Sequence, residues 1–346
     1  MKKMYKKLEK LASNYVDMLI KRMRDIESQG QWQKPWFPVR RRNFIPQNIR
    51  GNRYSGGNVI LLLIGMMFSD FRTPIFLTYK QAQEYGLKVI RKGCFYVYHF
   101  NYMYVHRLSG ETINEKDYKE LSEAGQEQYL KRPIAKQYHI FNLDQTDFQE
   151  KFPEQYASYL NHFSEEVRQN TDADSVRCLS LDKMLYNKEW VCPIELKKAN
   201  TAFYDFINDM IITPPKNQYP NPVDFYAVLL HEMAHSTGIE ERLNRKIENE
   251  FESPEYAREE LVAELSSALC GYYLGFETTI RDNHIQYIRY WIKVLSNEPT
   301  ILFEILSDIV KCVKYITERI GFELPETVSV EVKSEKQEVS GLQLVE

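Results

Sequence analysis

The sequence lacks the features that mark disulfide frameworks, membrane spans and repeat proteins. It has only 5 cysteines in 346 residues and no CxxC pair, which argues against a disulfide framework and a thiolate zinc site. The longest apolar run, residues 59–68, contains Gly65 and is far shorter than the roughly 20 residues of a membrane helix. The basic N-terminus is followed by neither an apolar stretch nor a small-residue cleavage site, so we expect no signal peptide and no membrane partner. A reducing cytoplasm is the expected location.

What the sequence contains is typical of a globular protein. Hydrophobic residues make up 43% and charged residues 27% of the chain, which excludes collagen, coiled coil and wholesale disorder. The length suggests two domains of the α+β class. We predict a basic, mixed α/β domain over residues 1–150 and a mainly helical domain with a small sheet over residues 151–324. Residues 325–346 are polar and have no helical period, which predicts a disordered tail.

The net charge of −3 conceals an asymmetry along the chain. Residues 1–107 hold 20 Lys+Arg and 6 Asp+Glu, whereas residues 108–346 hold 25 and 42. A basic segment joined to an acidic remainder favours binding of a polyanion by the basic part. The alternative is that these basic side chains only solubilise a surface.

Local patterns predict the secondary structure of several segments. Residues 4–27 are predicted to form an amphipathic helix because apolar residues recur at three- and four-residue steps. In the rest of the first domain, we predict a strand and a short helix over 75–86, strands over 94–106, a solvated helix over 110–131, and a strand and turn over 138–148. In the second domain, we predict mainly helix over 151–200 and a strand pair over 203–215.

The strongest local signal is HEMAH at residues 231–235. His231 and His235 are four residues apart on one helical face, so both rings can reach a single metal ion. Glu232 lies about 100° further round the helix, where it can contact a water molecule at the metal. Helix-start signals precede the motif at Asn221, Pro222 and Asp224. The alternative is a pair of histidines satisfied by hydrogen bonds inside a core.

A catalytic zinc site needs a third protein ligand, which residues 253–275 can supply. Glu260 and Glu264 share one face of this predicted helix, and small residues beside that face allow close approach to the HEMAH helix. We assign Glu260 as the third zinc ligand and Glu264 as the carboxylate that orients a ligand histidine. The reverse assignment stays open, as does a solvated carboxylate pair on an exposed face.

The basic first domain also carries aromatic residues, and single-stranded nucleic acid is typically held by a cationic groove with aromatic platforms for the bases. The residues predicted to contact nucleic acid are Lys34, Trp36, Arg50, Arg53, Tyr54, Asn58 and Lys80. Each aromatic residue has the alternative of a place in the core, and Asn58 has the alternative of structuring its loop.

Several of these segments resemble one family, the ArdC-type antirestriction proteins. Resemblance to that family's zincin-like C-terminal domain is carried by LLHEMAHSTGIEERLNR, YAREELVAELSSALCGYYLG and YIRYWIKVL. Resemblance to its single-stranded-DNA-binding domain is carried, in order, by KPW (34–36), GNRYSGGN (51–58), LTYKQAQEYG (77–86), RKG (91–93) and FNLDQ (141–145). The resemblance covers about residues 5–320. It implies a conjugative mobile-element protein that binds DNA and shields incoming DNA from host restriction, with zinc at His231, His235 and a glutamate of EELVAE.

Two functional hypotheses follow. In the first, the protein binds single-stranded DNA and is also a gluzincin-like zinc metallopeptidase, with Glu232 as the base and a protein substrate that the sequence does not identify. In the second, it acts by occupying DNA, and the metal only stabilises the fold. A zincin-like site does not by itself guarantee a peptide substrate.

Overall fold

The computed structural model describes residues 12–21, 23–24, 37, 44–66, 69–163, 177–245, 253–276, 278 and 285–323. Residues 12–21 are helical, in agreement with the predicted amphipathic helix as far as it is described. The predicted disordered tail and the two nucleic-acid candidates Lys34 and Trp36 lie outside the described residues.

The N-terminal half is built on a five-stranded sheet with the strand order β1-β2-β5-β3-β4. Its β1–β2 pair is parallel and its other pairs are antiparallel. The elements of this half are β1 (Gln47–Asn48), α2 (Gly57–Met66), β2 (Ile75–Thr78), α3 (Tyr79–Glu84), β3 (Phe95–His106), β4 (Thr112–Ile113), α4 (Glu115–Lys119), α5 (Glu123–Gln126), β5 (Tyr129–Asn142), η1 (Leu143–Gln145), α6 (Phe148–Lys151) and α7 (Pro153–Phe163).

The strand and short helix predicted over 75–86 are confirmed as β2 and α3. Thr78 explains the change from strand to helix, because its hydroxyl accepts a hydrogen bond from the Gln81 amide at 3.2 Å. The Gln81 side chain accepts one from the Thr78 amide at 2.8 Å, which completes a capping box. This cap places exposed Lys80 in the first turn of α3.

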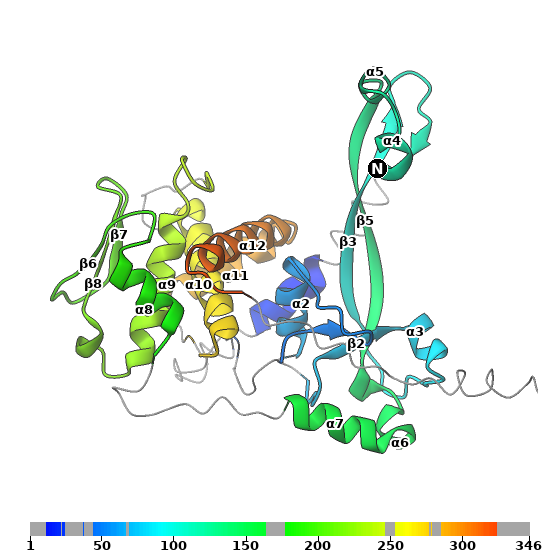
Figure 1. The fold of residues 1–346 in the computed structure, drawn as a ribbon, viewed down its shortest axis with the longest axis horizontal. Coiled ribbons are helices and arrows are strands. Elements are labelled where there is room, and N and C mark those ends of the chain that lie inside the picture. The colour runs from blue at the N-terminus through cyan, green and yellow to red at the C-terminus, as the bar shows by residue number, and fades with distance from the viewer. Residues whose placement is uncertain are drawn as a thin grey trace, which may run out of the picture.

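The long strands β3 and β5 form a ribbon that projects from the sheet, with α4 and α5 near its tip (Figure 1). The strand predicted over 94–106 is therefore confirmed, but the single solvated helix predicted over 110–131 is wrong. Asn114 and Ser122 each accept a hydrogen bond from an amide three residues later and so start two separate short helices. Tyr118 of α4 stacks on Tyr104 of β3 with ring centroids 3.7 Å apart, which holds the tip against the ribbon.

The C-terminal half is mainly helical, with a three-stranded sheet in the order β6-β8-β7. Its elements are α8 (Leu179–Asn187), β6 (Ile194–Leu196), β7 (Phe203–Asp205), β8 (Met210–Thr213), η2 (Lys216–Gln218), α9 (Pro222–Ser236), α10 (Pro254–Leu274), α11 (Ile285–Asn297) and α12 (Ile301–Arg319). The strand pair predicted over 203–215 is confirmed as β7 and β8. The mainly helical structure predicted over 151–200 is present in α7 and α8, while residues 164–176 lie outside the described residues. The strand β6 was not predicted, and it pairs in parallel with β8.

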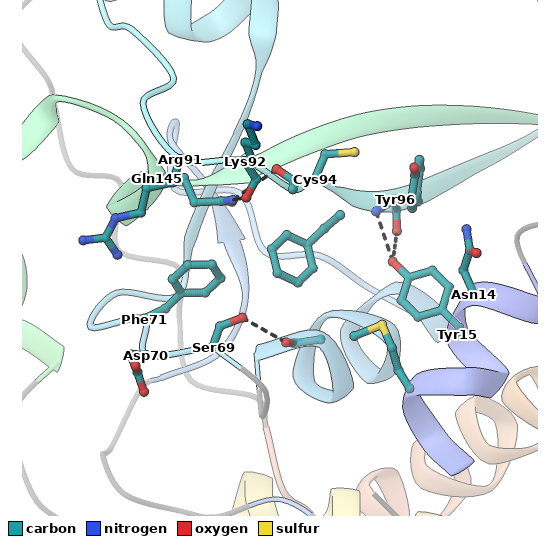
Figure 2. A pocket seen from close by; sticks show the side chains of 14 residues that line it. Asn14, Tyr15, Ser69, Asp70, Phe71, Arg91, Lys92, Cys94, Tyr96 and Gln145 are labelled. Carbon is teal, nitrogen blue, oxygen red and sulfur yellow. Dashed lines mark hydrogen bonds between the residues drawn. The ribbon is translucent and has the colours of Figure 1, made fainter. Parts of the chain in front are cut away.

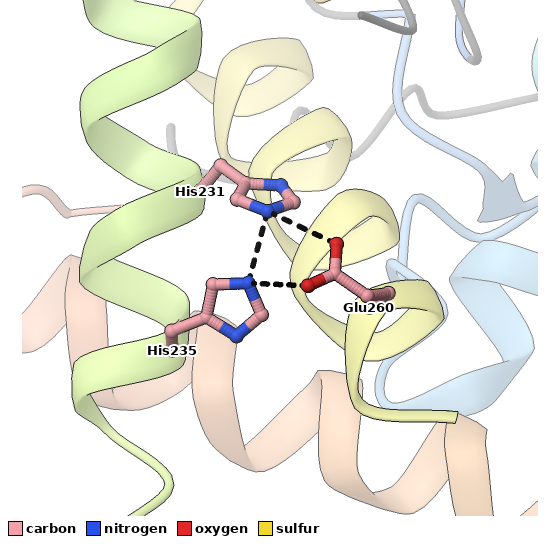
Figure 3. Close-up of side chains that lie close together, drawn as sticks. All are labelled: His231, His235 and Glu260. Carbon is pink, nitrogen blue, oxygen red and sulfur yellow. Dashed lines mark hydrogen bonds and ion pairs between the residues drawn. The ribbon is translucent and has the colours of Figure 1, made fainter. Parts of the chain in front are cut away.

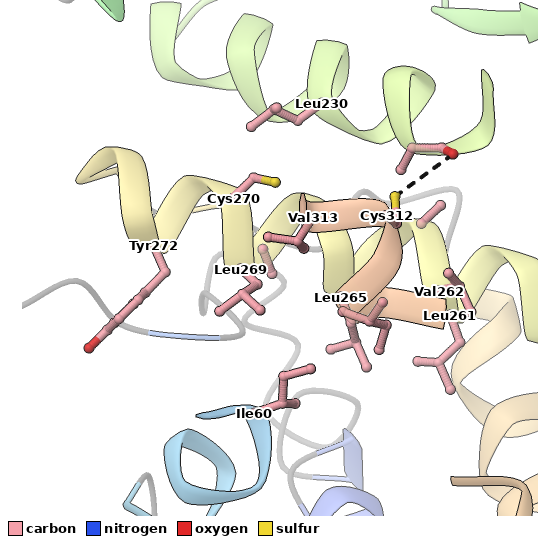
Figure 4. Packing of buried hydrophobic residues seen from close by; sticks show 14 of the residues in the cluster. Ile60, Leu230, Leu261, Val262, Leu265, Leu269, Cys270, Tyr272, Cys312 and Val313 are labelled. Atoms are coloured by element: carbon pink, nitrogen blue, oxygen red, sulfur yellow. Dashed lines mark hydrogen bonds between the residues drawn. The ribbon is translucent and has the colours of Figure 1, made fainter. Parts of the chain in front are cut away.

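The two halves share one hydrophobic core. Apolar side chains of α2 pack in the same cluster as those of α10 and α12, and Ile60 points from α2 toward the leucines of α10 in Figure 4. The rings of Tyr98 on β3 and Phe303 on α12 meet edge to face at 5.7 Å. Of the helices in the described residues, none is long and apolar enough to cross a membrane. The two halves therefore meet in one cluster around α2, whereas Ile75, Phe76, Leu77, Val97 and Ile140 of the N-terminal sheet lie in two further clusters.

Candidate metal centre and nucleic-acid surface

Helix α9 carries the HEMAH motif, and its start has the predicted signals. Asn221 accepts a hydrogen bond from the Val223 amide at 3.1 Å, and Pro222 occupies the first helical position. His231, Glu232 and His235 are all buried. The predicted helix is thus present, and it places the three side chains of the motif inside the protein.

Helix α10 runs next to α9 and is buried on nearly every side. It begins at the predicted cap, where the Ser253 hydroxyl accepts a hydrogen bond from the Tyr256 amide at 3.0 Å, and it ends at Gly275 with φ +86°. The Ser267 hydroxyl donates to the Ala227 carbonyl of α9 at 2.9 Å. This contact shows the close helix approach expected from the small residues of α10, while Leu261 and Leu265 fill the core on its other side.

Three side chains of these helices converge on one point (Figure 3). The Nε2 atoms of His231 and His235 are 3.0 Å apart. The Glu260 carboxylate oxygens lie 3.7 Å from His231 Nε2 and 3.4 Å from His235 Nε2. Among the described residues, this is the group of three metal-ligand side chains whose donor atoms lie within 4.8 Å of one another. Two imidazoles and a carboxylate form a donor set that fits a divalent transition-metal ion.

Each histidine of this cluster also faces a carboxylate with its second ring nitrogen. Glu264 lies 3.3 Å from His231 Nδ1, and Glu259 lies 3.3 Å from His235 Nδ1. Glu264 is therefore on the far side of the His231 ring from Glu260. Carboxylates in these positions fix the tautomer and orientation of ligand imidazoles and raise their basicity.

Burial and charge act in opposite directions on the ionisable groups of the cluster. Burial lowers the pKa of His235, but the carboxylates of Glu260 and Glu259 outweigh this and raise the pKa to about 10. Burial also opposes ionisation of Glu260, yet His235 and His231 hold the pKa of its carboxyl well below the usual range. The cluster therefore favours a positive charge between its donor atoms, as a metal-binding site must.

Arg245 was not predicted from the sequence, and Glu259, although part of EELVAE, was given no role of its own. Arg245 donates two hydrogen bonds to Glu259, from Nη2 to Oε1 at 2.7 Å and from Nε to Oε2 at 2.8 Å. Burial opposes the charge of Glu259, but the guanidinium of Arg245 keeps the pKa of this carboxyl below its ordinary value. Arg245 has no periodic or motif relationship to the histidines. The adjacent pair of glutamates at 259–260 was the available signal.

The predicted nucleic-acid contacts that the structure describes fall into two groups. Arg50 and Lys80 are exposed, and Arg50 forms an ion pair with Glu84 of α3 at 3.0 Å. Arg53 is half-buried, and burial lowers its pKa. Tyr54 and Asn58 have structural contacts, described next.

Tyr54 and Asn58 both support the fold of the N-terminal half. The ring of Tyr54 meets Phe76 edge to face at 6.2 Å, and burial raises its pKa. Asn58 donates to the Tyr98 carbonyl at 2.7 Å and accepts from the Tyr98 amide at 2.9 Å. These hydrogen bonds suit the alternative in which Asn58 structures its loop, and they attach α2 to the edge of β3.

Two family models match the chain. Residues 9–141 match the N-terminal domain of the anti-restriction factor ArdC, and residues 183–308 match a zincin-like metallopeptidase. A zincin-like domain implies a divalent metal ion.

Similar proteins include two from Escherichia coli described as DNA primase TraC, at 29% and 30% identity over 82% of this chain. The chain spans only 25% and 18% of the length of these two relatives. Protein y4eC of Sinorhizobium fredii is 24% identical over 80% of this chain and 82% of its own length.

Two crystal structures of the antirestriction protein ArdC from plasmid R388 have a similar fold. The metal-free structure has a TM-score of 0.64 and 26% identity, and the alignment covers 90% of this chain and 99% of that one. The Mn(II)-bound structure has a TM-score of 0.61 and 25% identity, with 90% and 98% covered. The predicted α+β class and the predicted resemblance are confirmed by these matches. This chain belongs to the ArdC-like proteins, in which an ArdC-type N-terminal domain precedes a zincin-like metallopeptidase domain.

Proposed function

We propose that this protein binds single-stranded DNA through its N-terminal half and protects incoming DNA from restriction in the cytoplasm. The match to the ArdC N-terminal domain and the excess of basic residues in this part of the chain support the proposal. Arg50 and Lys80 offer exposed cations. An ion pair as exposed as Arg50–Glu84 contributes little to stability, so a phosphate can replace the carboxylate at small cost.

A binding titration with single-stranded DNA at several salt concentrations tests the DNA part. The Arg50→Ala/Arg53→Ala variant should bind more weakly, and the slope of log affinity against log salt should fall by about 0.7 for each phosphate that the variant no longer neutralises. The Lys311→Ala/Lys314→Ala variant is the control, because it removes two exposed cations from α12. Equal affinities and slopes for the two variants would overturn the assignment of Arg50 and Arg53.

For the second half, we propose that His231, His235 and Glu260 hold a zinc ion and that Glu264 orients His231. The convergence of these three donors, with a carboxylate behind each imidazole, is the observation that carries this proposal. Two histidines and one glutamate are a donor set found in zinc peptidases. Because a similar structure contains Mn(II), metal analysis of the purified protein has to include manganese as well as zinc.

The proposed activity is hydrolysis of a peptide bond in a protein substrate. A divalent metal ion bound at this site supplies Lewis acidity. Glu232 follows His231 directly on α9 and provides a carboxylate that accepts a proton from the attacking water and returns it to the leaving amine. Glu264 and Glu259 keep the two imidazoles in the orientation that directs Nε2 toward Glu260.

Glu232→Gln tests the peptidase activity, with labelled casein as a general substrate. We expect this variant to keep its metal content and lose cleavage, because the amide has the shape of the carboxylate but cannot take up the proton. Glu240→Gln makes the same change at an exposed position just after α9 and should leave cleavage unchanged. Undiminished cleavage by Glu232→Gln would exclude Glu232 as the base.

A second candidate function is a DNA-binding protein whose metal is structural. Two observations favour this candidate: all three donors are buried, and they come from two adjacent helices. A metal ion bound to them would link α9 to α10 and so stabilise the fold. Under this candidate, Glu232→Gln should still protect plasmid DNA that enters a restricting host, whereas Arg50→Ala/Arg53→Ala should not. Loss of protection in Glu232→Gln alone would favour the peptidase.

A further inference from the structure

A cavity of about 390 Å³ lies in the N-terminal half, away from the metal centre. It is an open pocket lined by the helix of residues 12–21, the end of α2, residues 69–71 and the turn that leads into β3 (Figure 2). Its volume is at the lower end of the roughly 300–1,000 Å³ range of small-ligand pockets. A single nucleotide is a ligand of suitable size for such a pocket.

The aromatic wall of the cavity is held in place by defined contacts. Phe71 meets Phe95 edge to face at 5.6 Å. The Tyr15 hydroxyl donates to the Tyr96 carbonyl at 2.6 Å and accepts from the Tyr96 amide at 3.1 Å. This wall is therefore pre-organised. Any of the four bases can stack against an aromatic ring, so such a contact does not depend on the DNA sequence.

The RKG turn, residues 91–93, also lines the cavity, and the Gln145 side chain holds this turn in place. Gln145 Nε2 donates to the Gly93 carbonyl at 3.1 Å, and Gln145 Oε1 accepts from the Asn142 amide at 2.8 Å. Gly93 has φ +97°, a conformation that glycine adopts without strain. The turn presents Arg91 and Lys92 as exposed cations at the edge of the cavity.

The charges around the cavity suit a phosphate group. Arg91 and Lys92 are two cations of the lining, and Asp70 is its one carboxylate. Arg91 and Lys92 therefore leave an excess of positive charge beside an aromatic wall. Proteins that bind single-stranded nucleic acid combine aromatic stacking surfaces with cations that contact the phosphate backbone.

We propose that this cavity holds one nucleotide of a bound single-stranded DNA, with its base against Phe71 and its phosphate at Arg91 and Lys92. This inference rests on the DNA binding proposed above and adds a site to it. None of the residues that line the cavity belongs to the contacts predicted from the sequence, so the two sets of variants test different surfaces.

Cys94 lines the same cavity and provides a chemical reporter. Burial raises the pKa of the Cys178 and Cys192 thiols to about 11 and holds that of Cys270 well above its ordinary value, so these thiols react slowly near neutral pH. Cys94 is only half-buried. We expect iodoacetamide to modify Cys94 first, as located by mass spectrometry.

Protection of Cys94 by DNA tests the site directly. An oligodeoxythymidylate of about 16 nucleotides should slow alkylation of Cys94 at least about tenfold, and a duplex of the same length should not. Unchanged alkylation in the presence of saturating single-stranded DNA would overturn the nucleotide site.

A charge-reversal pair provides the matched control. Lys92 lines the cavity, whereas Lys88 is exposed in the same segment and does not line it. Lys92→Glu should weaken single-strand binding about tenfold and lower the salt slope by about one, whereas Lys88→Glu should lower the slope much less. Phe71→Leu should weaken binding by a similar factor while keeping the salt slope, because it removes the stacking face but no charge.

The outcomes separate the two proposals. If the unaltered protein does not bind single-stranded DNA, both the DNA function and the nucleotide site are wrong. If it binds DNA, but Lys92→Glu and Lys88→Glu behave alike and Cys94 stays reactive, the cavity is not the site and the DNA function stands.

Discussion

Arg245 holds both carboxylate oxygens of Glu259 directly behind His235 of the candidate metal centre. Arg245 also donates to the Thr237 hydroxyl at 2.9 Å and the Ala234 carbonyl at 2.8 Å. One guanidinium thus joins the end of α9 to the start of α10. The guanidinium of Arg245 and the carboxylate of Glu259 are almost fully buried, so each charge needs the other to offset the cost of its removal from water.

Arg245→Met should lower the free energy of unfolding by about 3–5 kcal/mol, because it leaves the Glu259 carboxylate buried without its cation. Urea denaturation of the metal-free protein measures this. Arg245→Met/Glu259→Leu should cost less than the sum of the two single variants, since it removes both charges together. Lys314→Met, which breaks an exposed ion pair with Glu318, should cost less than about 1 kcal/mol. If the losses of unfolding free energy in Arg245→Met and Glu259→Leu add up in the double variant, Arg245 and Glu259 are not energetically coupled.

Glu260→Gln should weaken metal binding more than Glu264→Gln does. Glu260 approaches both Nε2 atoms, whereas Glu264 contacts only the outer nitrogen of His231. We expect a loss of about 10–100-fold for Glu264→Gln, as for other carboxylates behind a ligand histidine, and a larger loss for Glu260→Gln. Competition with a chelator measures both affinities, with exposed Glu255→Gln as the control. The opposite order would assign Glu264 as the ligand.

Asp209→Asn should destabilise the protein in a pH-dependent way. Burial raises the pKa of Asp209, but hydrogen bonds from Arg242 and Tyr204 outweigh it and lower the pKa below the ordinary value. A lowered carboxyl pKa contributes stability above the unfolded-state pKa of about 3.9, and this stability is lost as the pH falls through the folded-state value. The free energy of unfolding of Asp209→Asn should therefore be about 1–2 kcal/mol below that of the unaltered protein from pH 5 to 7, and this difference should shrink below about pH 4.

Denaturant unfolding of both proteins across this pH range measures that difference. Exposed Asp17→Asn serves as the reference for the general effect of removing one negative charge. A difference that stays constant down to pH 2 would show that the Asp209–Arg242 pair does not depend on ionised Asp209.

Gly65→Ala should destabilise the N-terminal half. A Cβ atom at Gly65 would lie 2.5 Å from Cε1 and 2.7 Å from Cδ1 of Phe95, and Phe95 is itself packed against Phe76. The overlap should cost about 1–3 kcal/mol, more than the gain of up to about 1 kcal/mol from alanine in a helix. Thermal unfolding measures this, with Gly125→Ala of α5 as the control, because its Cβ would have contacts no shorter than 3.4 Å. Equal melting temperatures would show that Phe95 can move aside.

Local signals in the sequence predicted much of the geometry of the candidate metal centre. The caps at Asn221 and Ser253 and the spacing of His231 and His235 depend on residues within a few positions of each other. They therefore identified α9, α10 and the converging donors. The ion pair of Arg245 and Glu259 crosses a connection between two helices, and no local pattern encodes it.

Contacts between distant segments were harder to predict. The apolar segment 59–66 suits a buried strand as well as a buried helix, and its pattern alone does not decide between them. The pairing of β3 with β5 joins residues up to 45 positions apart, as Phe95 and Ile140 do, so neighbouring residues do not encode it. Tyr54 illustrates the same problem for the nucleic-acid surface, because a solvent platform and a core residue have the same sequence signature.

The shared interior of α2, α10 and α12 limits how the two proposed activities can be separated. A fragment that ends near residue 150 would expose the apolar face of α2 to water and would tend to aggregate rather than bind DNA. Metal loading in one half should correspondingly raise the melting temperature of the other half, because the shared core couples their unfolding. Transplanting the proposed DNA-binding half into another protein would therefore require either both halves together or polar replacements on α2.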